Sequence, residues 1–149
     1  SRPAARGSRS VSLLILDASV AIKWFLADEP GRDEALAILD VVRDDPARFA
    51  VPELFFNAML AVLARLVGDE PRALQSYLDA LQDLGFERVG NGRELLAAAA
   101  TLACEHGLSG YDAIHAASAR LVGGHWLTAD AKAHRKIQRL RISKVVCLG

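Results

Sequence analysis

The feature that most constrains the fold is a short apolar run, Val11 to Leu16, which ends at Asp17 and leads into a helical pattern. A run of this length without polar alternation is typical of a central strand that is buried on both faces of a sheet. The helical spacing continues from Val20 to Leu26, and the breakers Asp28 to Gly31 end it. A buried strand that runs directly into a helix is the first unit of an α/β fold.

The same alternation of strand and helix recurs along the rest of the chain. Pro52 is expected at a helix N-terminus, a position that proline favours. Further strands are predicted at 49–51, 86–89, 125–127 and 144–148, and helices at 35–44, 54–67, 71–85, 93–106, 109–121 and 129–140. Strands that alternate with single or paired helices predict an α/β fold with a mainly parallel sheet covered on both faces.

The length of 149 residues suits one compact domain, which we expect over residues 11–149. Residues 1–10 are rich in Arg, Ser, Ala and Gly, and we expect a disordered tail or a segment added for expression, since the first residue is not Met. This opening lacks the apolar core of a signal peptide, and no apolar run is long enough for a membrane span. Cys104 and Cys147 lie in apolar patterns, which favours two core thiols of a cytoplasmic protein over a disulfide.

Charge is balanced, with 18 Lys and Arg against 18 Asp and Glu. A net charge of zero gives no domain-wide basic field, so any contact with RNA must come from a local patch. The one basic stretch of interest comprises Lys132, Arg135, Lys136, Arg139 and Arg141. Binding of RNA phosphates and a plain solvated helix face are about equally good interpretations of it.

Three aspartates stand at similar points of the predicted fold. Asp17 follows the first strand, Asp130 lies in the turn after the strand at 125–127, and Asp112 ends the S-x-x-D pattern that begins at Ser109. Taken singly, each has a structural explanation as a helix cap or as an acid that complements the helix dipole. The interest lies in the combination.

Ligands of parallel sheets bind outside the carboxyl ends of the strands, where these aspartates are expected. Carboxylates that converge repel one another unless a cation neutralises them, and a hard ion such as Mg²⁺ or Mn²⁺ suits an all-oxygen site. Such an ion generates hydroxide from bound water and stabilises charge on a phosphate. The combination therefore indicates hydrolysis of phosphodiester bonds by metal-activated water.

The local sequences around these aspartates carry a resemblance to a known family. LILDASVAIKWFL, at 14–26, closely resembles the opening of PIN-domain toxins of the VapC type. VPEL at 51–54, LSGYDA at 108–113 and LTAD at 127–130 resemble later blocks of that family in the right order, so that the resemblance covers nearly all of 13–148. It implies a three-layer α/β/α sandwich and Mg²⁺- or Mn²⁺-dependent endoribonuclease activity. It also implies the toxin half of a type II toxin–antitoxin pair, usually a homodimer inhibited by a small antitoxin that binds DNA.

The resemblance also implies roles for particular residues. Asp17, Asp112 and Asp130 would be the catalytic acids and the metal ligands. Ser19 and Thr128 would be polar neighbours that position a carboxylate or a metal-bound water.

The chain departs from the family pattern at one position. The family usually carries a fourth acid, a Glu, six residues after the proline that stands here as Pro52, and this position is Ala58. Glu53 is turned about 140° round the helix from position 58, and Asn57 about 100°, so neither replaces it. Three explanations stay open: a natural site with three aspartates and more water, a degenerate member that binds without cutting, or an introduced replacement that permits expression of a toxic nuclease. Our hypothesis is that Ala58 weakens metal binding and cleavage.

Alternative functions remain for comparison. A catalytically impaired PIN-like module would act through metal, RNA or protein binding. A phosphatase of the Asp-x-Asp kind on a similar scaffold is disfavoured, because it needs an acid where Ser19 stands, and a receiver is disfavoured, because it needs paired acids at the end of its first strand. Trp24 is expected in the core, and His115, three residues after Asp112, is interpreted as a structural histidine.

Overall fold

The computed structural model describes residues 13–148, and the expected tail at 1–10 lies outside them. Five parallel strands form one sheet in the order β3-β2-β1-β4-β5. They are β1 (Leu14–Leu16), β2 (Phe49–Pro52), β3 (Glu87–Val89), β4 (His125–Thr128) and β5 (Val145–Cys147). The predicted parallel sheet is confirmed, and the run at the start of the chain forms its central strand.

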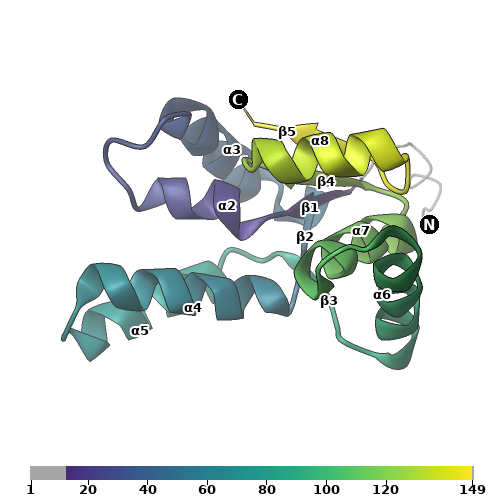
Figure 1. Cartoon of the computed structure of the whole chain (residues 1–149). Helices are drawn as coiled ribbons and strands as arrows, with labels where there is room; N and C mark the ends of the chain where they lie inside the picture. Colours follow the sequence, from purple (N-terminus) through teal and green to yellow (C-terminus); the bar gives the residue numbers. More distant parts are fainter. Residues whose placement is uncertain (1–12, 149) are drawn as a thin grey trace, which may run out of the picture.

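Helices cover both faces of this sheet (Figure 1). They are α2 (Ala18–Ala21), α3 (Arg32–Asp44), α4 (Leu54–Val67), α5 (Pro71–Gln82), α6 (Arg93–His106), α7 (Gly110–Val122) and α8 (Ala131–Leu140), with 3-10 turns η1 (Ile22–Trp24) and η2 (Pro46–Arg48). Successive strand residues point to opposite faces, so Leu16 packs into one core cluster with α2 to α5 and Ile15 into another with α6 to α8. The three-layer α/β/α sandwich predicted from the resemblance is confirmed.

The chain reverses direction across the sheet between β3 and β4. From β1 it moves outward through β2 to β3 and then returns past β1 to β4 and β5. The carboxyl ends of β1 and β4, which are neighbours, therefore flank the point where the strand order switches. This is the place where open parallel sheets bind ligands.

Some element boundaries differ from the predictions. Pro52 is the last residue of β2 and does not lie in the first turn of a helix, whereas α4 begins at Leu54 as predicted. A proline is tolerated at a strand end more readily than within a central strand, because it has no amide hydrogen for the ladder. The helix predicted from Val20 to Leu26 is instead the short α2 followed by η1, and α5 ends at Gln82.

The predictions for Trp24 and the cysteines had different outcomes. Trp24 is buried as expected, and its indole Nε1 donates a hydrogen bond of 2.8 Å to the carbonyl of Ala35. Both cysteines are free thiols, but Cys104 is exposed on α6 and Cys147 is only half-buried. The expectation of core thiols was wrong for Cys104, because its position on α6 faces solvent. Within residues 13–148, no helix combines the length and the apolar character that crossing a membrane requires.

Candidate active site

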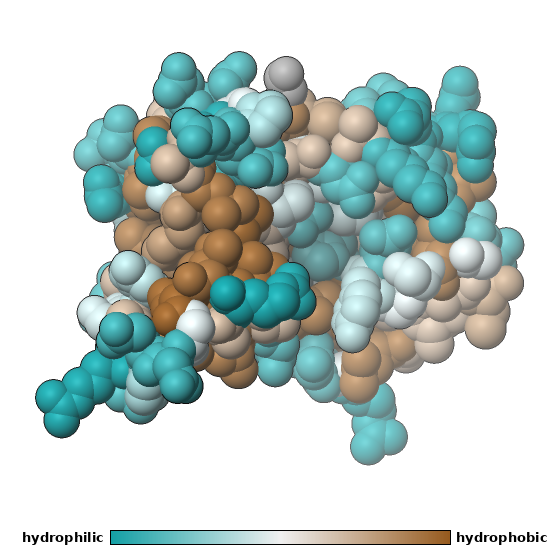
Figure 2. Space-filling model, turned by 60° about the vertical axis from the view of Figure 1, so that its left-hand side comes forward, coloured by the Kyte–Doolittle hydropathy of each residue, from teal (hydrophilic) through white to brown (hydrophobic). Residues whose placement is uncertain are grey.

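A cavity of about 420 Å³ lies at the carboxyl ends of β1 and β4. Asp17, Asp112 and Asp130 all line it, although nearly a hundred residues separate the first two in the chain. The mainly apolar wall that α4 contributes to this cavity includes Ala58 and Ala61. Figure 2 shows a hollow with hydrophilic surface at its base beside a broad hydrophobic area.

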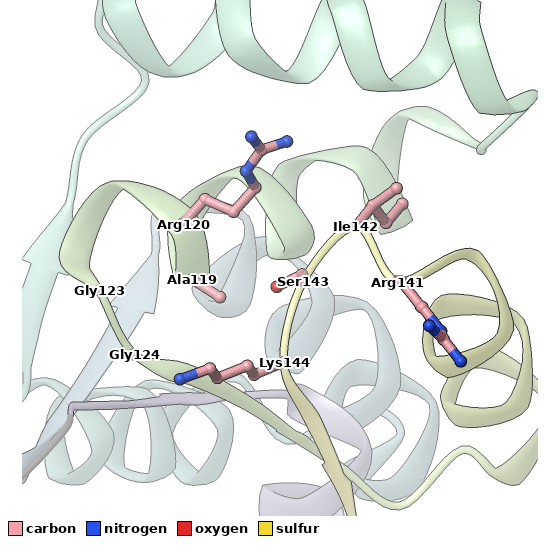
Figure 3. Close-up of a pocket in the computed structure, with 8 residues that line it drawn as sticks. All are labelled: Ala119, Arg120, Gly123, Gly124, Arg141, Ile142, Ser143 and Lys144. Atoms are coloured by element: carbon pink, nitrogen blue, oxygen red, sulfur yellow. The ribbon is translucent and has the colours of Figure 1, made fainter.

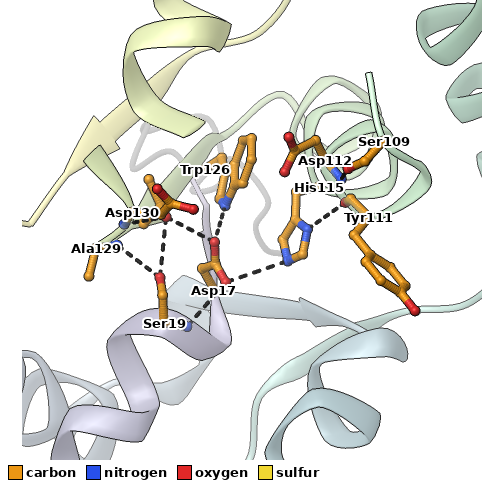
Figure 4. A network of polar contacts seen from close by, with 10 residues as sticks. Asp17, Ser19, Ser109, Tyr111, Asp112, His115, Trp126, Ala129 and Asp130 are labelled. Atoms are coloured by element: carbon orange, nitrogen blue, oxygen red, sulfur yellow. Dashed lines mark hydrogen bonds and ion pairs between the residues drawn. The ribbon is translucent and has the colours of Figure 1, made fainter. Parts of the chain in front are cut away.

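Asp17 is held in place by three hydrogen-bond donors. Its Oδ1 accepts from the backbone N–H of Ser19 at 3.1 Å, which makes it the N-cap of α2. Its Oδ2 accepts from the indole Nε1 of Trp126 at 3.0 Å and from the hydroxyl of Thr128 at 2.9 Å (Figure 4). The carboxylate is only 16% exposed and its orientation is therefore set by β4 as well as by its own turn.

Ser19 and Thr128 tie together the two turns that carry Asp17 and Asp130. The Ser19 and Thr128 hydroxyls are 3.2 Å apart. The Ser19 hydroxyl also accepts from the backbone N–H of Ala129 at 2.9 Å, and the Thr128 hydroxyl accepts from that of Asp130 at 3.0 Å. Both predicted polar neighbours thus connect the β1–α2 turn to the β4–α8 turn.

The Asp130 carboxylate caps a helix, whereas the Asp112 carboxylate does not. Asp130 is the N-cap of α8, and its Oδ1 accepts from the backbone N–H groups of Lys132 at 3.0 Å and Ala133 at 3.2 Å. At the start of α7, Ser109 caps the helix by accepting from the backbone N–H of Asp112 at 3.1 Å. The Asp112 carboxylate itself makes no hydrogen bond within residues 13–148. Capping accounts for Asp130 but leaves the Asp112 carboxylate free for a ligand.

Two residues next to Asp17 were not assigned to the site from sequence. His115 was interpreted as structural and Trp126 only as part of a strand. The two rings stack, with centroids 5.0 Å apart and planes inclined by 17°. The Nε2 atom of His115 lies 4.0 Å from Oδ1 of Asp17. The available signals were the spacing of Trp126 and Thr128, which share one face of a strand, and the spacing of His115 from Asp112 along one helix.

The donor set fits a hydrated divalent ion better than a fully chelated one. Carboxylates from three elements face one cavity, which suits Mg²⁺ or Mn²⁺. Within the described part of the chain, however, no three acidic, histidine or cysteine side chains are close enough to hold an ion together. Mg²⁺ commonly keeps several water ligands and uses one or two carboxylates. The buried Nε2 of His115, which has no hydrogen-bond partner among residues 13–148, is a further potential ligand at this place.

A second cavity, of about 490 Å³, lies at the amino ends of β4 and β5 (Figure 3). Arg120, Arg141 and Lys144 border it, and no acidic side chain of the described residues lines it. In Figure 3 the side chains of Arg120 and Arg141 extend away from its centre, where Ser143 lies. This arrangement is unsuited to a divalent cation and does not converge on a single anion.

These features define the class of the domain. It is a parallel α/β sandwich in which three aspartates line a cavity at the point where the strand order switches. The model of the PIN domain family matches residues 14–140. The chain therefore belongs to the PIN domain family.

Solved structures agree with this fold. The chain is similar to a toxin–antitoxin complex from Klebsiella pneumoniae, with 20% identity and a TM-score of 0.63 over 93% of this chain and 98% of that one. It is similar to VapBC2 from Rickettsia felis bound to a promoter DNA fragment, with 12% identity and a TM-score of 0.71 over 92% and 99%. FitAcB from Neisseria gonorrhoeae shares 20% identity and a TM-score of 0.65 over 89% and 96%. A search of curated proteins gives no match. At these identities the likeness establishes the fold.

Proposed function

We propose that the chain is a Mg²⁺- or Mn²⁺-dependent endoribonuclease that serves as the toxin of a type II toxin–antitoxin pair. The observation that carries the proposal is the meeting of Asp17, Asp112 and Asp130 around one cavity of a PIN domain. Three carboxylates at one cavity call for a cation, and phosphodiester hydrolysis is the chemistry that a hard cation supports best.

Asp17, Asp112 and Asp130 would hold a hydrated ion between them, each directly or through one of its water ligands. When bound, the ion would activate water and stabilise charge on the phosphate. The contribution of the chain is orientation. Trp126 and Thr128 hold the Asp17 carboxylate from the β4 side, and Thr128 also holds the backbone N–H of Asp130. Such anchoring limits the movement of both acids, so that little reorganisation is needed when substrate arrives.

RNA would be held by the basic helix that follows Asp130. Lys132, Arg135 and Arg139 are exposed on α8, and the cavity-lining Asp130 caps the start of the same helix. The spacing of these cations by three or four residues places them on one side of the helix. Because the chain has no net charge, this local patch is the best-supported contact for phosphates.

The expected protein partners are a cognate antitoxin and a second copy of the chain. The similar structures from Klebsiella pneumoniae and Rickettsia felis are toxin–antitoxin complexes, the second bound to DNA. Leu60 and Leu66 on α4 and Tyr77 on α5 are large apolar side chains that are at least 40% exposed. Exposed apolar surface of this kind suits a protein interface. We propose a cytoplasmic location, since the RNA substrate and the antitoxin would be met there.

A catalytically impaired module is the second candidate. Two observations favour it: Ala58 leaves the α4 wall without a carboxylate, and no three potential ligands in residues 13–148 form a chelating group. Such a protein would bind metal or RNA without cutting.

Calorimetry with Mn²⁺ and cleavage of a labelled RNA distinguish these functions. The nuclease proposal expects Mn²⁺-dependent cleavage, and Asp17→Asn should lower Mn²⁺ affinity on the order of tenfold or more. Asp40→Asn, an exposed aspartate on α3, is the matched control and should change neither. Binding of Mn²⁺ and RNA without cleavage would establish the impaired module. Absence of Mn²⁺ binding by the unaltered chain would refute the metal-dependent mechanism.

A further inference from the structure

We propose that His115 supplies a nitrogen ligand to the divalent ion beside Asp17, so that the site has a mixed nitrogen and oxygen donor set. The inference rests on the proposed metal-dependent function, and it adds a histidine ligand to the three aspartates. It implies a preference for transition-metal ions over Mg²⁺, because imidazole nitrogen suits such ions better.

The hydrogen bond on the far side of the ring sets which nitrogen faces the cavity. Nδ1 of His115 lies 2.8 Å from the backbone carbonyl oxygen of Tyr111. A carbonyl oxygen only accepts hydrogen bonds, so Nδ1 carries the hydrogen and donates it. In the neutral ring, Nε2 then presents its lone pair. A hydrogen bond from the other ring N–H to a backbone carbonyl is a usual way in which proteins orient a metal-binding histidine.

The Nε2 atom is buried and lacks a partner. His115 is 7% exposed, and no hydrogen bond to Nε2 occurs within residues 13–148. A buried polar atom without a partner is uncommon, because it has lost its hydrogen bonds to water without gaining others. His115 lines the same cavity as the three aspartates, so an ion there would satisfy Nε2.

The distance from His115 to Asp17 fits two ligands of one ion. Nε2 and Oδ1 are 4.0 Å apart, which is too long for a hydrogen bond. Donors on one ion with bonds of about 2.1 Å lie roughly 3 to 4 Å apart.

Trp126 holds both donors at this separation. Its indole ring stacks on the His115 imidazole, and its Nε1 donates to Oδ2 of Asp17, the other oxygen of the same carboxylate. Among the described residues, the Asp17 Oδ1 that faces His115 accepts a hydrogen bond only from the backbone N–H of Ser19. A carboxylate oxygen has room for a further interaction beside that bond. Ala58 on α4 supplies no ligand where the family usually has a Glu. His115 on α7 would supply one ligand atom in its place, although without a negative charge.

Electron spin echo spectroscopy of Mn²⁺ bound to the full chain tests this directly, because it detects nitrogen bonded to the metal. We expect a ¹⁴N coupling in the unaltered protein. His115→Gln should remove the coupling and lower the affinity for Co²⁺ roughly tenfold, with a much smaller effect on Mg²⁺. His106→Gln, at the end of α6 and away from the cavity, is the matched control and should keep the coupling.

A measurement without any substitution guards against a variant that fails to fold. Protein labelled with ¹⁵N-histidine should show a ¹⁵N coupling in place of the ¹⁴N coupling, and His115 is the one histidine of the described residues that lines the cavity. If Mn²⁺ binds and is lost in Asp17→Asn but shows no histidine coupling, the role of His115 is refuted while the proposed function stands. If no Mn²⁺ binds, both are refuted.

Discussion

The indole Nε1 of Trp126 donates a 3.0 Å hydrogen bond to Oδ2 of Asp17 while the same ring stacks on His115. One buried strand residue thus orients a carboxylate at the end of β1 and an imidazole on α7. Trp126 is 1% exposed, and its indole packs into the second core cluster while its N–H reaches the site. The contact makes the geometry of the site depend on the packing of the core.

Replacing Trp126 with Phe should separate the hydrogen bond from the aromatic stacking. Loss of a hydrogen bond to a charged group should lower the free energy of unfolding by about 1–3 kcal/mol and also weaken Mn²⁺ binding. Urea denaturation and calorimetry measure the two effects. Trp24→Phe is the matched control, because the Trp24 indole also donates a buried hydrogen bond, to Ala35, and Trp24 does not line the cavity. Equal effects of both variants on Mn²⁺ affinity would contradict the orienting role of Trp126.

Asp112 and Asp130 should respond differently to loss of the carboxylate. Asp112→Asn should change stability only slightly, because the Asp112 carboxylate accepts no hydrogen bond within the described residues and favours α7 only through the helix dipole, but it should weaken Mn²⁺ binding. Asp130→Ala removes the N-cap of α8 and should cost about 1 kcal/mol in thermal or urea unfolding.

Asp130→Asn is the informative control for that pair. Asn accepts the same backbone hydrogen bonds at an N-cap, so stability should recover while Mn²⁺ affinity stays low. If Asp130→Asn binds Mn²⁺ as well as the unaltered chain, Asp130 acts only as a helix cap.

Restoring a carboxylate at position 58 tests the meaning of Ala58. Ala58→Glu places an acid in the α4 wall of the cavity and should raise both Mn²⁺ affinity and the rate of RNA cleavage. Ala61→Glu adds the same charge to the same wall, about 60° further round the helix, and should gain less. The hypothesis that Ala58 weakens the site fails if neither Mn²⁺ affinity nor cleavage improves in Ala58→Glu.

Salt dependence tests whether α8 holds RNA. Combined replacement of Lys132, Arg135 and Arg139 by Gln should weaken RNA binding without metal present. It should also reduce the slope of log affinity against log salt by about 0.7 for each phosphate that the helix no longer neutralises. Gln keeps the helix, so stability should change little.

The control for α8 is an equal loss of charge elsewhere. Arg43, Arg65 and Arg72 are exposed on α3, α4 and α5. Replacing these three by Gln should leave the salt slope unchanged. A similar fall in slope for both triple variants would indicate a non-specific charge effect and would argue against a binding face on α8.

Local patterns were enough to predict nearly every helix and strand. The run before Asp17 became β1, and the glycines at 107 and 123 end α6 and α7 in left-handed conformations, as helix-terminating glycines do. The boundary errors at Pro52 and beyond Ala21 arose where tertiary context overrode the local pattern. Strand β2 extends to Pro52 because Pro52 pairs with Val89 on β3.

The parts of the site that could be predicted from the sequence are those that follow the ends of predicted strands. The carboxyl ends of parallel strands share one edge of a sheet, so Asp17 and Asp130 were expected together. The hydrogen bond from Trp126 to Asp17 joins residues 109 positions apart and depends on β1 and β4 being neighbours in register. Periodicity predicts which face of an element is buried, but not which side chain of another element it meets. The partners of His115 and Trp126 are therefore a property of packing, and they orient the Asp17 carboxylate in the cavity that Asp112 and Asp130 also line.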